Sequence, residues 1–125
     1  MMRFMVVDDS QVIRNQIQHT LSGKFEIVGL AKDGLEAMSE FRELTPEVVT
    51  MDLTMPNMDG IATIQAMMEI DSQVRILVVS ALSDKLTALR ALRLGAYGFL
   101  TKPFTTYQLM DAVEELISDL VDDNA

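Results

Sequence analysis

The chain has 125 residues, 49% hydrophobic and 23% charged, which is the size and balance of one globular domain with a substantial core. Its formal net charge of -9 disfavours contact with nucleic acid or anionic membranes, so neither is an expected partner. The absence of Cys excludes disulfides and thiolate metal sites, and no apolar run approaches the length of a membrane span. We therefore expect a single cytoplasmic domain over residues 1–125.

Short apolar segments alternate five times with segments of helical periodicity. The predicted strands are residues 3–7, 25–30, 47–51, 74–79 and 98–101. The first and fourth are almost continuously apolar, which is typical of central parallel strands covered on both faces. The second alternates polar and apolar residues around Glu26 and Gly29, as an edge strand does.

Each predicted helix follows a strand and repeats apolar residues three or four positions apart. Ser10 can cap the first helix, and "TTYQ" opens the last one with a capping box. The fourth helix is expected to run from Asp84 as its cap to Gly95, with Leu86, Leu89 and either Leu92 or Arg93 on successive turns. Most of the 10 Met residues fall on such apolar stripes and are expected to fill the core.

Five strand–helix units in succession predict an α/β fold, a doubly wound parallel sheet with helices on both faces. In such sheets the functional crevice lies beyond the carboxyl ends of the strands. The residues that follow the strands are Asp8 and Asp9, Asp52, Ser80 and Lys102. Three carboxylates, a hydroxyl and an amine are therefore expected at one edge.

This set of side chains indicates phosphoryl chemistry. Clustered carboxylates repel one another unless a cation neutralises them, and oxygen ligands favour Mg²⁺ over zinc. Lys102 can hold a phosphoryl oxygen, and Ser80 can donate a hydrogen bond to another. Asp52 stands alone after a central strand and is the candidate to attack phosphorus, which would give an acyl phosphate.

The segments "VVDDS", "VVTMDLTMPNMDG", "VVSA" and "GAYGFLTKPF" resemble the receiver domain of two-component response regulators, from about Phe4 to about Leu120. The chain is most similar to stand-alone, chemotaxis-type receivers. The resemblance implies a flavodoxin-like sheet of five strands in the order 2-1-3-4-5. It also implies that Asp52 is the phospho-acceptor and that Asp9 binds Mg²⁺ directly. Asp8 would act through a metal-bound water, and Thr54 would contribute its backbone carbonyl.

The resemblance further assigns a switch hydroxyl to Ser80, a switch aromatic to Phe99 and the site lysine to Lys102. It implies a cis peptide bond between Lys102 and Pro103, which would aim the amine into the site. The residues that flank the path of an attacking water would be Thr54 and Leu82. Because Leu82 has no polar group and is bulky, we expect slow loss of the phosphoryl group.

The implied partners are a sensor histidine kinase as phosphodonor, an output protein and a phosphatase. The output protein would contact the surface of the fourth helix, fifth strand and fifth helix, and the chain would be a monomer or a phosphorylation-linked dimer. It would catalyse only its own phosphorylation and dephosphorylation. A basic strip on the fourth helix faces an acidic last helix: Lys85, Arg90 and Arg93 against Asp111, Glu114, Glu115 and Asp119.

Three alternatives compete with a stand-alone receiver. A phosphohydrolase with an Asp nucleophile would need a second carboxylate two residues later, where this chain has Thr54. A flavin-binding module on the same fold would have its phosphate repelled by Asp8 and Asp9. A receiver portion of a methylesterase or transcription factor would share the same motifs; the initial Met and the lack of a linker favour the stand-alone protein.

His19 is expected to be an ordinary helical residue.

Overall fold

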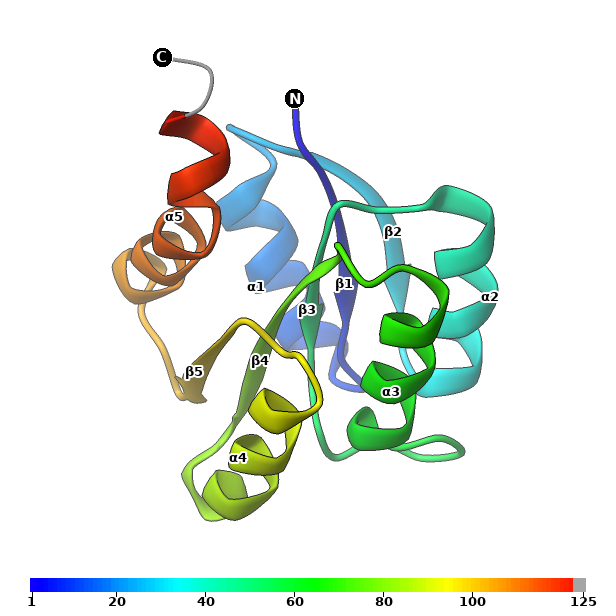
Figure 1. Ribbon diagram of the computed structural model, residues 1–125. Helices are drawn as coiled ribbons and strands as arrows, with labels where there is room; N and C mark the ends of the chain where they lie inside the picture. The colour runs from blue at the N-terminus through cyan, green and yellow to red at the C-terminus, as the bar shows by residue number, and fades with distance from the viewer. Residues whose placement is uncertain (123–125) are drawn as a thin grey trace.

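The predicted sheet is confirmed in the computed structural model, which describes residues 1–122 apart from the side chains of Leu82, Val121 and Asp122 (Figure 1). Five parallel strands lie in the order β2-β1-β3-β4-β5. Their bounds are β1 Arg3–Val7, β2 Glu26–Ala31, β3 Val48–Met51, β4 Arg75–Ala81 and β5 Gly98–Lys102. The strand with the alternating pattern, β2, is indeed at an edge, and the two most apolar strands, β1 and β4, are internal.

The helices cover the sheet on both faces (Figure 1). They are α1 Gln11–Leu21, α2 Gly34–Leu44, α3 Gly60–Ile70, α4 Lys85–Arg93 and α5 Thr106–Asp122, with a short 3-10 turn, η1, at Leu82–Asp84. Within the described residues, no helix is both long and apolar enough to cross a membrane.

Alternation along the strands divides the core into two layers. In β1, Phe4 and Val6 pack with α1 and α5, whereas Met5 and Val7 pack with α2, α3 and α4. The layer on the α1 and α5 side is rich in branched and aromatic residues. The layer on the other side holds the five methionines that are buried among the described residues: Met5, Met38, Met51, Met55 and Met67. The prediction that Met fills the core is confirmed.

The apolar stripe expected on the fourth helix does not face the core. Leu86 is 79% exposed and Leu89 is 47% exposed, while Ala88 and Ala91 are buried against the sheet layer. Small alanines let the short helix approach the sheet closely, and the bulky leucines one position away are then turned to solvent. The prediction from leucine spacing was therefore wrong about which face is buried.

α4 lacks the side-chain cap at its N-terminus that the other helices have. Ser10, Asp33, Asp59 and Thr105 each accept a hydrogen bond from a first-turn backbone N–H of the helix that follows. The capping box of Thr105 and Gln108 is confirmed by reciprocal bonds of 3.0 and 2.9 Å. Asp84 occupies the cap position of α4, but its side chain makes no capping bond. Its expected role as a side-chain cap is thus corrected.

The direction in which successive strands are added across the sheet reverses between β1 and β3, because β2 lies beside β1 on one side while β3, β4 and β5 follow on the other. A doubly wound sheet has its crevice at such a point, beyond the carboxyl ends of the strands. Val7 of β1 pairs with Met51 of β3, so the next residues, Asp8 and Asp52, stand level.

Candidate functional site

Three carboxylates meet at the carboxyl edge of the sheet. Asp8 is fully buried, Asp52 is 4% exposed and Asp9 is exposed. One carboxylate oxygen from each of the three lies within 4.8 Å of the others. The structure thus brings together the acidic residues that the sequence placed after β1 and β3.

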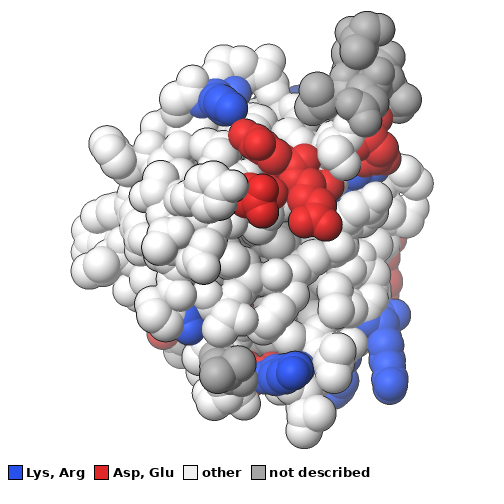
Figure 2. Space-filling view, turned by 90° about the vertical axis from the view of Figure 1, so that its left-hand side faces the viewer, with Lys and Arg blue, Asp and Glu red and all other residues white. Residues whose placement is uncertain are grey.

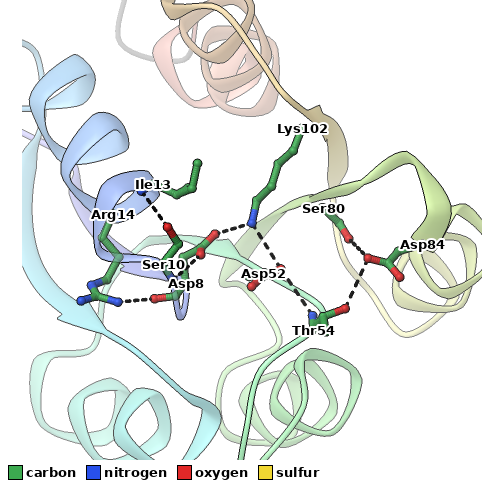
Figure 3. Close-up of polar contacts among 9 residues, drawn as sticks. All are labelled: Asp8, Ser10, Ile13, Arg14, Asp52, Thr54, Ser80, Asp84 and Lys102. Carbon is green, nitrogen blue, oxygen red and sulfur yellow. Dashed lines mark hydrogen bonds and ion pairs between the residues drawn. The ribbon is translucent and has the colours of Figure 1, made fainter.

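Lys102 reaches this cluster from the end of β5, as Figure 3 shows. Its Nζ lies 2.8 Å from Oδ2 of Asp8 and 3.5 Å from Oδ1 of Asp52. Burial by itself lowers the pKa of the Lys102 amine, but the hydrogen bond and charge of Asp8, together with Asp52, outweigh burial and raise that pKa. The amine is therefore held as a cation between two buried carboxylates.

Asp52 is in an unfavourable place for a negative charge. Burial, followed by the charge of Asp8, raises the pKa of Asp52 to about 7, although Lys102 and the N–H of Thr54 act in the opposite direction. One amine leaves three clustered carboxylates with excess negative charge. Oxygen ligands of this kind, in excess of the local positive charge, fit a hard divalent cation such as Mg²⁺.

The turn after β1 is fixed by its own hydrogen bonds. Oδ1 of Asp8 accepts from the backbone N–H of Ser10 at 2.9 Å, and Oγ of Ser10 accepts from the N–H of Ile13 at 3.3 Å (Figure 3). Arg14, one turn into α1, donates from Nη1 to the carbonyl oxygen of Asp8 at 2.6 Å. The sequence analysis missed Arg14; its position one helical turn beyond Ser10 was the available signal.

The loop after β3 is held from two sides. The N–H of Thr54 donates to Oδ1 of Asp52 at 3.3 Å, so the loop folds back over the Asp52 carboxylate. Asn57 has a positive φ of 69° and donates from Nδ2 to Oδ2 of Asp33 at 2.9 Å. At the start of α3, Gly60 leaves no room for a side chain, because a Cβ there would meet the backbone of Asp52 and Leu53.

The switch hydroxyl candidate, Ser80, donates its hydrogen bond to Asp84 and not to Asp52. Its Oγ donates to Oδ2 of Asp84 at 3.0 Å, and Oγ1 of Thr54 donates to the same oxygen at 3.3 Å. In Figure 3 the dashed lines from these two hydroxyls meet at one oxygen of the Asp84 carboxylate. Sequence reasoning assigned Asp84 only a capping role; its spacing of four residues from Ser80 was the signal for this contact.

The remaining predicted site residues lie further out. Phe99 is half-buried on β5 and packs against the methionine-rich layer. It also lines a surface cavity of about 450 Å³ with Tyr107 and Asp111 of α5. The Lys102–Pro103 peptide bond is cis, as the resemblance implied. The expected crowding by Leu82 depends on a side chain outside the described residues; the backbone of Leu82 begins η1.

Figure 2 looks onto the face formed by α4, β5 and α5, and acidic side chains gather on its upper half. The acidic residues of α5 predicted there are exposed, but two of them have partners within the chain. Glu114 pairs with Lys24 at 3.2 Å, and Asp119 is bound by Arg75, with 2.7 Å between Nη2 and Oδ2. On α4, the basic residues Arg90 and Arg93 are exposed.

Known proteins of one family resemble this chain in sequence. Residues 4–114 match the model of the response regulator receiver domain. The chemotaxis protein CheY of Bacillus subtilis is 35% identical over 93% of this chain and 98% of the relative. A protein-glutamate methylesterase/protein-glutamine glutaminase of Methanococcoides burtonii is 39% identical, but this chain covers only 34% of it.

Solved structures agree with this assignment. A crystal structure of the CheX–CheY–BeF3–Mg²⁺ complex from Borrelia burgdorferi matches with a TM-score of 0.88 and 30% identity, over 93% of this chain and 89% of that chain. The response regulator domain of Thermotoga maritima CheB matches with a TM-score of 0.78 and 34% identity, over 97% and 94%. The sheet order, the matched domain and these relatives lead to one conclusion: the chain belongs to the response regulator receiver domain family.

Proposed function

We propose that this protein is a single receiver domain, spanning residues 1–125, that accepts a phosphoryl group from a sensor histidine kinase onto Asp52 in the presence of Mg²⁺. The observation that carries the proposal is the Lys102 amine, which lies 2.8 Å from Asp8 and 3.5 Å from Asp52 in the crevice. A fixed cation beside a buried carboxylate can hold a phosphoryl oxygen while that carboxylate attacks.

The transfer moves one phosphoryl group between two protein side chains. A carboxylate oxygen of Asp52 bonds to phosphorus as the bond from phosphorus to the donor's histidine nitrogen breaks. That nitrogen keeps the electron pair and takes up a proton. Mg²⁺, held by Asp9, Asp52 and the carbonyl of Thr54, with Asp8 acting through water, would neutralise charge as the donor approaches.

The signal would then pass from the phosphoryl group to the output face. Phosphorylation adds about two negative charges next to Lys102. Ser80 moves toward a phosphoryl oxygen, and Phe99 turns into the space that Ser80 leaves. An output protein reads the altered surface of α4, β5 and α5. Equal partner affinity before and after phosphorylation would contradict this step.

The test of the proposal is exposure to acetyl phosphate with Mg²⁺, followed by intact-mass measurement. We expect one added phosphoryl group, none after chelation, and none on the site in Asp52→Asn. Asp71→Asn, at the end of α3 on the opposite edge, is the matched control and should be phosphorylated like the unchanged protein. Normal labelling of Asp52→Asn at its usual site, or indifference to the chelator, would refute the assignment.

A further inference from the structure

The carboxylate of Asp84 accepts two side-chain hydrogen bonds at a position where a helix cap is expected. Ser80 Oγ lies 3.0 Å from Asp84 Oδ2, and Thr54 Oγ1 lies 3.3 Å from the same atom (Figure 3). Ser80 is fully buried and Asp84 is half-buried, so the contact between them is shielded from solvent on the Ser80 side.

A serine hydroxyl carries a single proton and can donate one hydrogen bond at a time. While Ser80 donates to Asp84, it has no proton left for an oxygen on Asp52. The two acceptors therefore compete for one donor, and the carboxylate is a strong acceptor.

We propose that Asp84 is a positioning residue that holds the Ser80 hydroxyl away from Asp52 until phosphorylation, and that the released Asp84 then caps α4. This inference rests on the proposed function, because it assigns a resting partner to the hydroxyl that the phosphoryl group must recruit. It makes Asp84 a direct link between the acceptor site and the first turn of α4.

The second half of the inference follows from the state of α4. Asp84 stands at its cap position with φ -95° and ψ 18°, outside the extended region that capping residues adopt, and it makes no capping bond. The four other helices all have such a bond. The first N–H groups of an α-helix have no acceptor within the helix, and negative charge is favoured beside them. A carboxylate freed from Ser80 can therefore accept a hydrogen bond from the N–H of Leu86 or Thr87 at the start of its own helix.

Capping requires the backbone at Asp84 to move into the extended region, so the start of α4 must shift when the bond to Ser80 is lost. Repulsion between the phosphoryl group and the Asp84 carboxylate acts in the same direction. A change of hydrogen-bond partner at one side chain would thus become a displacement of the helix that borders the output face.

The first experiment measures the affinity for BeF3⁻ with Mg²⁺, a phosphoryl mimic, by calorimetry, because the chain has no Trp to report binding. Asp84→Ser keeps a residue that caps helices well but removes the carboxylate that reaches Ser80. We expect binding on the order of tenfold tighter than in the unchanged protein, the effect of losing one hydrogen bond to a charged acceptor. Asp71→Ser, which removes the same charge far from the site, should leave the affinity unchanged.

A double-variant cycle separates positioning from simple charge removal. In a Ser80→Ala background, Asp84→Ser should tighten BeF3⁻ binding by at most about threefold, because only the charge effect is left. An equal gain in both backgrounds, or no gain with Ser80 present, would overturn the inference. Failure of every variant to bind BeF3⁻ would instead overturn the proposed function itself.

Hydrogen exchange tests the capping step. On addition of BeF3⁻ and Mg²⁺, the amides of Leu86 and Thr87 should exchange more slowly in the unchanged protein. In Asp84→Ala, which has no side chain able to cap, this added protection should be absent. Equal protection in both proteins would contradict the exchange of partners at Asp84.

Discussion

Among the single residues, Asp52 bears most of the electrostatic cost of the site. It is 4% exposed and lies beside the buried Asp8, and Lys102 is the cation paired with both carboxylates. An arrangement of this kind is destabilising in the absence of a cation, since desolvated like charges repel each other. The function proposed for Asp52 and the stability of the fold are therefore opposed.

Asp52→Asn should consequently stabilise the protein when metal is removed. We expect the free energy of unfolding at neutral pH to rise by about 1–3 kcal/mol in a chelating buffer, because a buried like charge is lost. Urea unfolding with and without Mg²⁺ checks this. The metal should stabilise the unchanged protein more than the variant, so the difference should shrink as Mg²⁺ is added. A variant less stable than the parent in chelator would contradict this view of the cluster.

A second prediction concerns the loop anchor Asp33. The N–H of Glu36 and then the side chain of Asn57 hold the pKa of Asp33 below its ordinary value of 3.8. A carboxyl whose pKa is lower in the folded state than in the unfolded chain stabilises the fold when the pH is above its unfolded-state pKa. This contribution is lost as the pH falls through the lowered pKa of the folded state. Asp33→Asn should be less stable than the parent at pH 7, and the gap should close in acid.

Urea unfolding across pH provides the measurement for Asp33. Asn57→Ala removes one of the two bonds and should reduce the gap without abolishing it, because the bond from Glu36 is left. Stability curves that stay parallel from neutral pH to strong acid would show that Asp33 contributes no such linkage.

The lifetime of the phosphoryl group is set at Thr54 and Leu82 in our proposal. An attacking water is oriented by hydrogen bonds, and Thr54 offers one short hydroxyl, which already donates to Asp84. We expect slow intrinsic loss, and Thr54→Asn combined with Leu82→Glu should shorten the lifetime. Intact mass followed over time after removal of the donor measures this. Loss within seconds in the unchanged protein, or a longer lifetime in the double variant, would contradict it.

Among the elements, α4 differs most from expectation. Leucine spacing correctly predicted a helix there but pointed to the wrong buried face, because Ala88 and Ala91 form an equally regular stripe. Periodicity locates an apolar face, yet it cannot choose between a stripe of small residues and a stripe of large ones. That choice depends on how closely the helix approaches the sheet, which is a tertiary property.

The exposed surface of α4 leads to a prediction about association. Arg90 and Arg93 are exposed in a chain of net charge -9, and their neighbour Leu89 is also exposed. If this surface contacts an acidic partner or α5 of a second copy, replacing both arginines with Glu should weaken association severalfold, through lost attraction and new repulsion.

Sedimentation with BeF3⁻ and Mg²⁺, and binding to a purified output protein, measure that association. Arg42→Glu, on the exposed side of α2, is the control for the change in charge. Unchanged dimerisation and unchanged partner binding in the α4 variant would show that the two arginines are ordinary solvated surface residues with no role in association.

For the molecule as a whole, the sheet and the crevice were predictable from local signals. Polar residues stand at or next to the ends of the predicted strands, and a parallel topology brings those ends to one edge of the sheet. For this reason the sequence alone predicted that Asp8, Asp52 and Lys102 lie together. The contacts of Asp84 were not predictable in the same way. Its residue type suits a helix cap, and its bond to Thr54 joins two loops thirty residues apart in sequence.

The uneven distribution of methionine across the sheet has a consequence for how the protein can be observed. Within the part of the chain that the structure describes, all five buried methionines lie in the layer under α2, α3 and α4, with the partly buried Met58 and Met68 packed against it. The layer under α1 and α5 has Met2 and Met110 at its margin. Unbranched thioether side chains repack more readily than branched or aromatic ones, so the sheet has a pliable side and a stiff side. Isotope-labelled methionine methyl groups would therefore place five buried reporters inside the pliable layer and two more, on Met58 and Met68, against it. The two marginal methyl groups would serve as an internal reference in the same spectrum.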